Sequence, residues 1–532
     1  MGTKTQVTIG RLAALLAIGW SLVASAATPA QPARASVAQG HLQGVAAADG
    51  VQAFLGVPYA QPPVGPLRWA APQPAPAWPG VRQAQQFGPR PMQRPLYSDM
   101  MFRSPSISED CLYLNIWTPA PAGKAALAGR KLPVLVYFYG GGFQAGDSAE
   151  ARYDGASMAR HGVVSVTVNY RLNVFGFLAH PELTAASPQH ASGNYGLMDQ
   201  AAALQWVQRN IAAFGGDPGR VTIAGESAGS YSVSAQMLSP LARGTFARAI
   251  GESGSLLGLA PLPSLAWAEQ AGQRFAALAG AADLAALRAL PAEQLLAVSG
   301  HADAPSFFAI ADGHVLPGQP VALYAAGAQA RVPLLAGWNS QEGDGAGWFD
   351  GAAPSAAGLA SAVRRRLGDT PAATAVLQAY QAAAPDPLQA ATLLASDQFI
   401  GYGTWQWLTL HARSSGQPVY RYYYTQPRPA SKAGDIPAAR GATHSAEIEY
   451  ALGNLDLNPV FAWGADDRRA AQLLQGYFLQ FIRHGNPNGA GLKHWPALAA
   501  DGSGQLMQLG AQARLVPAED AARYQALARS QP

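Results

Sequence analysis

Short, nearly uninterrupted apolar runs recur along the chain and predict strands that are buried on both faces of a sheet. The first two cover residues 131–139 (KLPVLVYFY) and 163–170 (VVSVTVNY). Runs of the same kind follow at 221–224, 332–336 and 418–424. Between 51 and 78, many prolines interrupt the apolar segments, which favours loops and edge strands.

Stretches with an amphipathic period separate these runs and predict helices. From 196 to 214, apolar residues recur every three or four positions, until Gly215, Gly216 and Pro218 end the pattern. Further helices are expected after residue 229 to about 238, within 262–295 and over 466–484, the last being the final helix of the chain. Alternating strands and helices predict an α/β fold with a mostly parallel central sheet, flanked by helices. With no internal repeat or interdomain linker, residues 41–532 are expected to form one domain with helical insertions.

The N-terminus has the pattern of a secretory signal peptide. Lys4 and Arg11 precede an apolar stretch over 12–23, and Ala24, Ser25 and Ala26 form a small-residue cleavage site. Cleavage is expected after about Ala26, followed by a flexible leader over 27–40 and a secreted or periplasmic mature protein. The alternative, an N-terminal membrane anchor, is weaker because the apolar core is short for a membrane span.

Composition supports a large globular core, since 49% of the 532 residues are hydrophobic and 13% are charged. The net charge is only +4, and the chain has no basic run of five residues, so a nucleic-acid partner is not expected. Cys111 is the single cysteine, which excludes an intrachain disulfide. A buried thiol is favoured over pairing between chains.

A candidate nucleophile lies directly after the strand at 221–224. The sequence Gly225-Glu226-Ser227-Ala228-Gly229 fits the sharp strand-to-helix turn that exposes a serine hydroxyl in α/β-hydrolases. The pentapeptide alone is a weak signal, because short motifs recur by chance. Its position after a buried strand makes Ser227 the first candidate.

A serine nucleophile needs a base and a group that orients the base, and in this fold the acid precedes the histidine. Glu342 follows the strand at 332–336 and is the preferred acid, with Asp344 and Asp312 as alternatives. His444, His484 and His494 lie in the expected C-terminal region. The residues alone leave His444 in competition with the other two.

Glycines 140–142, in the sequence YGGGF, follow the strand at 131–139 and let backbone N–H groups approach a ligand closely. Together with the amide of Ala228 they predict an oxyanion hole, although a purely structural glycine turn remains an alternative.

Several sequence blocks resemble the type-B carboxylesterase family, a group of α/β-hydrolases that includes the cholinesterases. They are GVPYAQPPVGPLRW at 56–69, SEDCLYLNIW at 108–117, YGGGF at 139–143, VTVNYRLNVFGFL at 166–178, the segment 193–229 ending in GESAG, and HSAEIEY at 444–450. The resemblance runs from about 51 to 496. It implies Ser227 as nucleophile, Glu342 as acid and His444 as base, with the oxyanion donors Gly141, Gly142 and Ala228.

The resemblance also suggests roles beside the triad. Ser253 matches a serine often found near the triad, although it could equally be an ordinary loop hydroxyl, and Glu226 is expected to support the triad beside it. Arg68 with Glu109, and Arg171 with Asp199, match structural salt bridges of the family.

Three departures from the family pattern are visible. Cys111 matches half of a family disulfide, but Pro91 stands at the partner position. The segment 97–103 (YSDMMFR) lacks the tryptophan that binds choline in cholinesterases, which argues against a choline site. Asn173 stands where many relatives have glycine.

The expected function is hydrolysis of small-molecule carboxylic esters through an acyl-enzyme, without a metal or organic cofactor. Alternatives are bulky or polymeric esters, amides or carbamates, and a non-catalytic binding protein of the same fold. Phe307 and Phe308 are expected to line an acyl pocket or to pack in the core. The sequence leaves the oligomeric state open.

Overall fold

The structure is a computed structural model that describes residues 1–3, 33–47, 50–119, 131–518 and 520–530. The predicted signal peptide at 1–26 lies, apart from its first three residues, outside the described residues. Residues 32–532 form one compact unit, which contains every candidate site residue.

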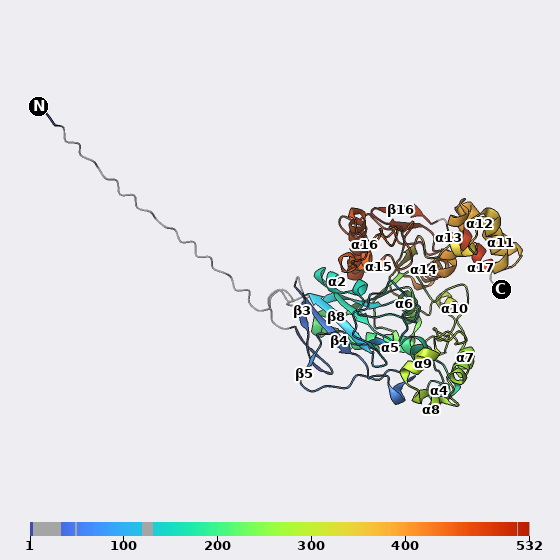
Figure 1. The fold of residues 1–532 in the computed structure, drawn as a ribbon, viewed down its shortest axis with the longest axis horizontal. Coiled ribbons are helices and arrows are strands. Elements are labelled where there is room, and N and C mark those ends of the chain that lie inside the picture. Colours follow the sequence, from blue (N-terminus) through green and yellow to red (C-terminus); the bar gives the residue numbers. More distant parts are fainter. Residues whose placement is uncertain (4–32, 48–49, 120–130, 519, 531–532) are drawn as a thin grey trace. The chain divides into compact units, whose positions relative to one another are not determined.

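A sheet of eleven strands organises this unit in the described part of the chain, in the order β16-β15-β14-β13-β12-β11-β9-β10-β8-β4-β3 (Figure 1). The strands are β3 (Val45–Ala47), β4 (Val51–Pro58), β8 (Tyr113–Pro119), β9 (Leu132–Phe138), β10 (Val164–Val168), β11 (Gly216–Glu226), β12 (Arg248–Glu252), β13 (Leu334–Asn339), β14 (Val419–Tyr424), β15 (Gln505–Leu509) and β16 (Ala513–Pro517). The five strands predicted from apolar runs are β9, β10, β11, β13 and β14.

The centre of the sheet is parallel and its two edges are antiparallel. All neighbours from β10 to β15 pair in parallel, whereas β8 pairs antiparallel with β10, and β16 pairs antiparallel with β15. The β9 sequence is continuously apolar because its strand is buried from Pro133 to Phe138. The parallel arrangement brings the carboxyl ends of the central strands to one edge of the sheet.

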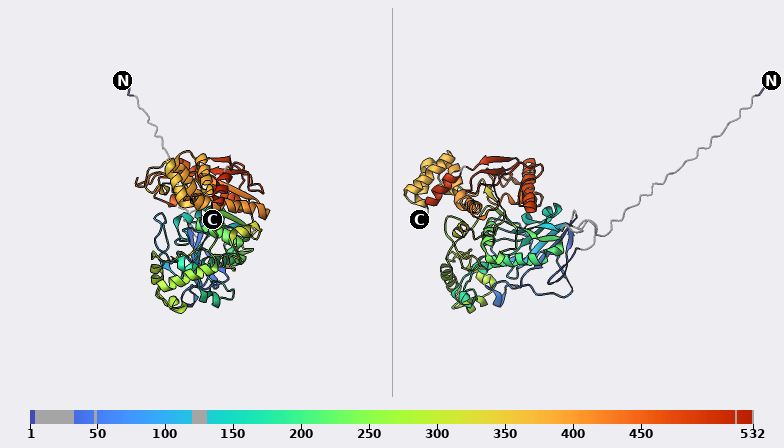
Figure 2. Two further views of the ribbon diagram at one scale, coloured as in Figure 1. Left: turned by 90° about the vertical axis from the view of Figure 1, so that its right-hand side faces the viewer. Right: turned by 180° about the vertical axis from the view of Figure 1, so that it is seen from behind.

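Helices flank the sheet in two groups, and Figure 2 shows the later segments of the chain gathered together, apart from the earlier ones. One group contains α5, α6, α10 and α14, and the other contains α15, α16 and α2, in which Gln475 of α16 donates a hydrogen bond to Ser157 of α2. The helices are α2 (Ala156–Arg160), α3 (Asn173–Phe177), α4 (Pro181–Ala186), α5 (Tyr195–Asn210), α6 (Ala228–Leu238), α7 (Leu265–Leu278), α8 (Leu284–Ala289), α9 (Ala292–Val298), α10 (Pro320–Ala325), α11 (Ala356–Leu367), α12 (Pro371–Ala383), α13 (Pro387–Ser396), α14 (Tyr402–Ser415), α15 (Ile448–Leu452), α16 (Ala465–His484) and α17 (Ala521–Arg529).

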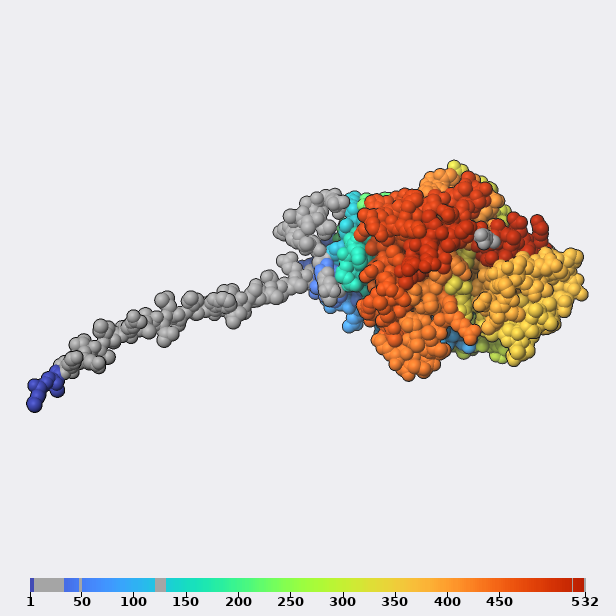
Figure 3. Space-filling view, turned by 90° about the horizontal axis from the view of Figure 1, so that it is seen from above, coloured from blue at the N-terminus to red at the C-terminus, as the bar shows by residue number. Residues whose placement is uncertain are grey.

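The predicted helix at 196–214 is α5 followed by a short 3₁₀ turn, Ile211–Phe214, which ends at Gly215 in a left-handed conformation. The helix predicted at 466–484 is α16, but it is not the final one. Strands β15 and β16 and helix α17 follow it. Figure 3 shows the C-terminal part of the chain, coloured red, at the surface seen from above.

The N-terminal segment contains a small sheet of β1 (Arg34–Val37), β2 (Gly40–Gln43) and β5 (Val81–Gln83). The prediction of a flexible leader is therefore wrong for residues 34–40, because β1 pairs with β2 along its full length. Ala35 and Leu42 of this sheet are buried, so apolar packing holds the segment in place.

Two predicted salt bridges are present. Arg68 bonds both carboxylate oxygens of Glu109, and Arg171 bonds both oxygens of Asp199 from a fully buried position. Cys111 is a buried free thiol. Pro91 and Cys111 border the same small cavity.

Asn173 has a physical reason to stand where relatives have glycine. Its φ is 50°, in the left-handed region that glycine adopts freely and that asparagine tolerates better than most residues. Its side chain also accepts a hydrogen bond from the N–H of Val174.

Candidate active site

Ser227 occupies a sharp turn between β11 and α6. Its φ and ψ are 51° and −122°, a strained conformation for a residue with a side chain. The positions of the two flanking glycines leave no room for a side chain. A Cβ on Gly229 would lie 2.0 Å from the carbonyl oxygen of Phe138, and a Cβ on Gly225 would lie 2.6 Å from the backbone of Gly229.

The other candidate residues lie on loops at the same edge of the sheet. The glycine loop follows β9, Ser253 follows β12, and Glu342 lies three residues beyond the end of β13. His444 lies between β14 and α15, and its loop is tied to the Glu342 loop by a β-bridge between Gln341 and Thr443. This is the edge at which ligands bind in open α/β sheets.

The structure brings Ser227, His444 and Glu342 into one chain of hydrogen-bond contacts. Nε2 of His444 lies 2.9 Å from Oγ of Ser227, and Nδ1 lies 2.6 Å from Oε2 of Glu342. The Glu342 carboxylate is fixed in turn, because Oε1 accepts hydrogen bonds from the Asn339 N–H and the Ser253 hydroxyl, each 2.6 Å long.

The alternative acids and bases lie elsewhere. Asp344 is exposed and accepts a hydrogen bond from the N–H of Ala346, while Asp312 accepts from the N–H groups of His314 and Leu316. His484 belongs to the last turn of α16, and His494 is exposed.

The glycine loop borders the same pocket as Ser227. Gly141 and Gly142 have φ values of 103° and 63°, and a Cβ on Gly141 would lie 2.2 Å from the carbonyl oxygen of Ala145. Within the described part of the chain, neither N–H group is bonded to an acceptor. Ala228 begins helix α6, so its N–H is also free of the helix ladder.

Several buried carboxylates surround the histidine. Oε1 of Glu226 lies 3.3 Å from Nε2 of His444. Oε2 of Glu447 accepts a hydrogen bond from the side-chain amide of Asn339, and Oε1 lies 2.9 Å from Oγ of Ser253, so the Ser253 hydroxyl lies between Glu342 and Glu447. The sequence patterns predicted no role for Glu447, although it lies three residues after His444 in the HSAEIEY block.

This environment shifts the pKa values of the cluster. Burial alone would lower the pKa of His444, but the charges of Glu226 and Glu342 outweigh it and raise the pKa to about 9. Burial raises the pKa of Glu226 to about 8, despite the opposing effect of His444. Burial, together with the charge of Glu342, raises the pKa of Glu447 to about 7.

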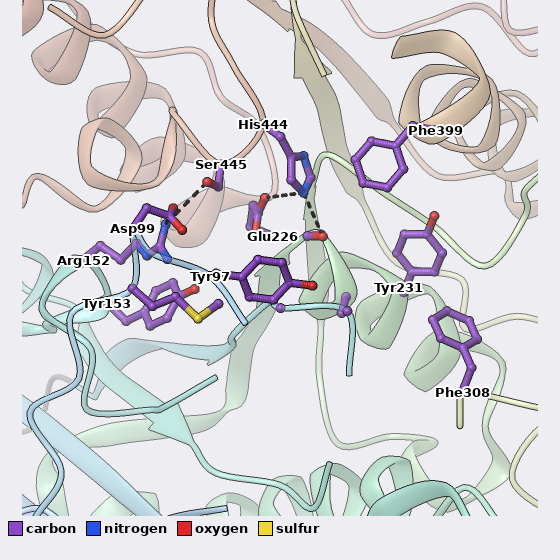
Figure 4. A pocket seen from close by; sticks show the side chains of 15 residues that line it. Tyr97, Asp99, Arg152, Tyr153, Glu226, Tyr231, Phe308, Phe399, His444 and Ser445 are labelled. Atoms are coloured by element: carbon purple, nitrogen blue, oxygen red, sulfur yellow. Dashed lines mark hydrogen bonds and ion pairs between the residues drawn. The ribbon is translucent and has the colours of Figure 1, made fainter. Parts of the chain in front are cut away.

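The pocket beside Ser227 has a volume of about 360 Å³ and two unlike ends, which Figure 4 shows. Aromatic rings of Tyr231, Phe308 and Phe399 lie at one end, and the Phe399 ring is 5.0 Å from that of His444. Phe308 thus lines the pocket, whereas Phe307 is buried against Phe275. The other end holds Tyr97, Asp99, Arg152, Tyr153 and Ser445. Arg152 and Phe399 were not predicted from the sequence, because they belong to no recognised motif.

The described residues contain no group of three or more histidine, cysteine or acidic side chains arranged to hold a metal ion. In the same part of the chain, every helix is too short or too polar to cross a membrane.

Comparisons with known proteins agree with this fold. A sequence model of the carboxylesterase family matches residues 31–527. Among curated proteins, the chain is 36% identical to a fumonisin B1 esterase from Sphingopyxis macrogoltabida, over 87% of this chain and 84% of that protein. It is 35% identical to a medium-chain fatty acyl-CoA hydrolase precursor from Anas platyrhynchos, over 86% of this chain and 84% of that protein.

Among solved structures, the carboxylesterase EST55 of Geobacillus stearothermophilus is similar over 93% of this chain and 99% of its own, with a TM-score of 0.78 and 33% identity. The fold is therefore that of the α/β-hydrolases. The chain belongs to the carboxylesterase family and is a serine hydrolase of carboxylic esters.

Proposed function

We propose that Ser227 is the nucleophile of this esterase, His444 its general base and Glu342 the acid that orients His444. The observation that carries this proposal is the continuous contact from Ser227 Oγ through both ring nitrogens of His444 to Glu342. A serine hydroxyl becomes a useful nucleophile only when such a base can take its proton.

In the first half of the reaction, His444 removes the hydroxyl proton as Ser227 Oγ attacks the ester carbonyl. The N–H groups of Gly141, Gly142 and Ala228 stabilise the oxyanion that develops. The carbon–oxygen bond to the alcohol then breaks, and the alcohol leaves with the proton held by His444. In the second half, His444 activates water, which attacks the acyl-enzyme and releases the acid.

Ser253 and Glu226 support this machinery. The Ser253 hydroxyl and the Asn339 N–H hold one oxygen of Glu342, which leaves the other oxygen directed at His444. Glu226, close to Nε2, stabilises the imidazolium that forms when His444 is protonated. No step of this reaction requires a metal or an organic cofactor.

The natural substrate is proposed to be a small-molecule ester, since the pocket of about 360 Å³ lies at the small end of ligand sites. The names of the relatives include a fumonisin B1 esterase and cocaine esterases, so the substrates named within the family differ. Amides, carbamates and bulky esters are the competing substrates.

We also propose that residues 1–26 act as a signal peptide and that the mature enzyme is exported to the periplasm or the medium, without a stable membrane anchor. The charged start, the apolar core and the Ala24-Ser25-Ala26 site support this. Mass spectrometry of the exported protein tests it: an N-terminus near Ala27 is expected, and an intact Met1 in that fraction would contradict it.

A turnover panel tests the catalytic proposal. Purified protein is assayed with 4-nitrophenyl acetate, butyrate and octanoate, and with 4-nitroacetanilide as the amide. We expect turnover of at least one short ester and loss of that turnover in Ser227→Ala. Ester turnover that persists in Ser227→Ala would contradict the assignment, and faster turnover of the amide would identify an amidase.

A further inference from the structure

Arg152 places a buried positive charge in the wall of the pocket, and no step of the proposed ester hydrolysis uses it. Its side chain is only 3% exposed, yet it lines the pocket that contains Ser227. Nε donates to Oε1 of Glu150 at 2.6 Å, and Nη1 donates to Asp99 at 3.2 Å and to Ser445 at 3.4 Å. Among the residues that the structure describes, none accepts a hydrogen bond from Nη2.

This guanidinium has spare donors in a concave site. A guanidinium carries five N–H donors, and three contacts leave the two on Nη2 without an acceptor. An anionic group of a ligand is the partner that a guanidinium binds best, through paired charge-assisted hydrogen bonds.

The partners of Arg152 differ in how firmly they are held. Glu150 is fully buried and its Oε1 also accepts from the N–H of Met101, so it is a fixed partner. Asp99 is 46% exposed and makes one contact of 3.2 Å with Nη1. Asp99 can therefore turn toward solvent at small cost, because exposed ion pairs contribute little.

The surrounding charges leave Arg152 able to attract an anion. Glu449 faces it but is paired with Arg428 at 2.7 Å. Burial raises the pKa of Glu150 to about 7, which reduces the negative charge that an arriving anion would meet near neutral pH. Asp99 is thus the main competitor for the guanidinium.

The pocket end that contains Arg152 and the reaction centre at Ser227 belong to one pocket, so a single substrate can reach both. Tyr97 lies between Arg152 and the catalytic residues in Figure 4, and its hydroxyl would be 3.1 Å from a Cβ built on Gly142. The aromatic end, with Phe308 and Phe399, lies on the far side of the catalytic centre. An ester with one apolar half and one charged half matches both ends.

We propose that the pocket end formed by Arg152, Asp99, Tyr97 and Ser445 binds a carboxylate carried by the ester, which displaces Asp99 from Arg152. The enzyme then prefers anionic esters over neutral esters of the same shape. This inference rests on the proposed function, because it assumes that the ester reacts at Ser227.

Matched ester pairs test the preference, with the carboxylate placed on either half of the substrate. For the alcohol half, 3-acetoxybenzoate is compared with 3-acetoxybenzamide. For the acyl half, 4-nitrophenyl hydrogen adipate is compared with 4-nitrophenyl methyl adipate. In each pair, the ratio of kcat/KM for the anionic ester to that for the neutral ester is measured, so that changes common to both esters cancel.

We expect the anionic ester to be preferred in at least one pair. Arg152→Gln should lower that ratio by about tenfold, which is the size expected for losing a charge-assisted hydrogen bond. Asp99→Asn should raise the ratio by roughly threefold, because it removes the exposed competitor and keeps the guanidinium. Arg103→Gln is the matched control, because Arg103 pairs with Asp154 and neither residue lines the pocket. The ratio of kcat/KM values measured for this variant should equal that of the unmodified enzyme.

The opposite responses of the two variants distinguish a binding role from a structural one. If Arg152→Gln does not fold, Asp99→Asn decides alone, since its site is largely exposed. A ratio that Asp99→Asn leaves unchanged or lowers in both pairs would overturn the carboxylate site. Turnover of the neutral esters tests the proposed function separately. If Ser227→Ala abolishes that turnover but Asp99→Asn does not change the ratios, the carboxylate site is contradicted and the proposed function is not.

Discussion

Two buried clusters of charged side chains in this protein differ in how their charges are paired. Around His444, the carboxylates of Glu226, Glu342 and Glu447 are packed together, and Oε1 of Glu226 has no hydrogen bond within the described residues. At the Arg171 pair, one guanidinium meets one carboxylate, and Asp199 accepts three hydrogen bonds from Arg171, of 2.7 to 3.0 Å.

The difference distinguishes residues that take part in the reaction from residues that stabilise the fold. Carboxylates that lie close together repel one another, and this repulsion raises their pKa values. Groups with pKa values shifted in this way can exchange a proton during a reaction. A matched pair with all bonds satisfied has no group ready to give or take a proton. We therefore expect changes near His444 to alter rates and pH profiles, and changes at Arg171 to alter stability.

The largest expected effect is on catalysis. Ser227→Ala should reduce kcat by on the order of 10⁴-fold or more, as removal of a nucleophile does in other serine hydrolases. Its thermal midpoint should change little, because the substitution removes only one side-chain hydrogen bond, that to His444. A parallel loss of folded protein, measured by circular dichroism, would mean that the serine is structural.

The next largest effect is on stability. Asp199→Asn should lower the free energy of unfolding by about 3–5 kcal/mol, because it leaves the buried charge of Arg171 without its partner. Urea unfolding measures this value. If the loss were below about 1 kcal/mol while kcat fell, the division between the two clusters would be wrong.

A change of one carboxylate beside His444 should shift the pH profile. His444 acts as a base only when deprotonated, so activity falls as the pH drops through its pKa, which the neighbouring carboxylates raise. The acid limb of kcat/KM is therefore expected above about pH 6.5, the ordinary value for histidine. Glu226→Gln removes one of these charges and should move the limb to lower pH. Asp344→Asn, on an exposed loop, is the control and should leave the limb in place.

The smallest effect should come from an exposed ion pair. Asp456 and Arg468 are 77% and 53% exposed, and their bond of 2.9 Å lies at the surface. Asp456→Asn should change the free energy of unfolding by less than about 1 kcal/mol. A loss as large as that of Asp199→Asn would show that burial does not decide the contribution of a pair in this fold.

The sequence predicted five strands of the central sheet and the candidate nucleophile Ser227 because local patterns carry both. Continuous apolar runs indicate β9 and β10, and the strand-to-helix turn at Ser227 requires glycines at fixed neighbouring positions. The choice of His444 over His484 needed the family resemblance, because the contact joins residues 217 positions apart.

The remaining features depend on tertiary contacts that have no local signature. Strand β1 is short and only its pairing with β2 places it in a sheet, so the segment looked like a leader. Arg152 and Asp99 lie 53 positions apart and meet only where the pocket forms. Helix α17 is short and Ala-rich, and its Arg523 and Tyr524 contact Asp397, far away in sequence.

Covalent labelling of Ser227 tests the central claim most directly. The native enzyme is incubated with diisopropyl fluorophosphate, which traps activated serine nucleophiles, and is then digested and analysed by mass spectrometry. We predict one phosphorylated site, on the peptide that carries Ser227, with loss of esterase activity in proportion to labelling and no label in His444→Ala. Full inactivation with the label on another residue, or unchanged labelling of Ser227 in His444→Ala, would contradict the account.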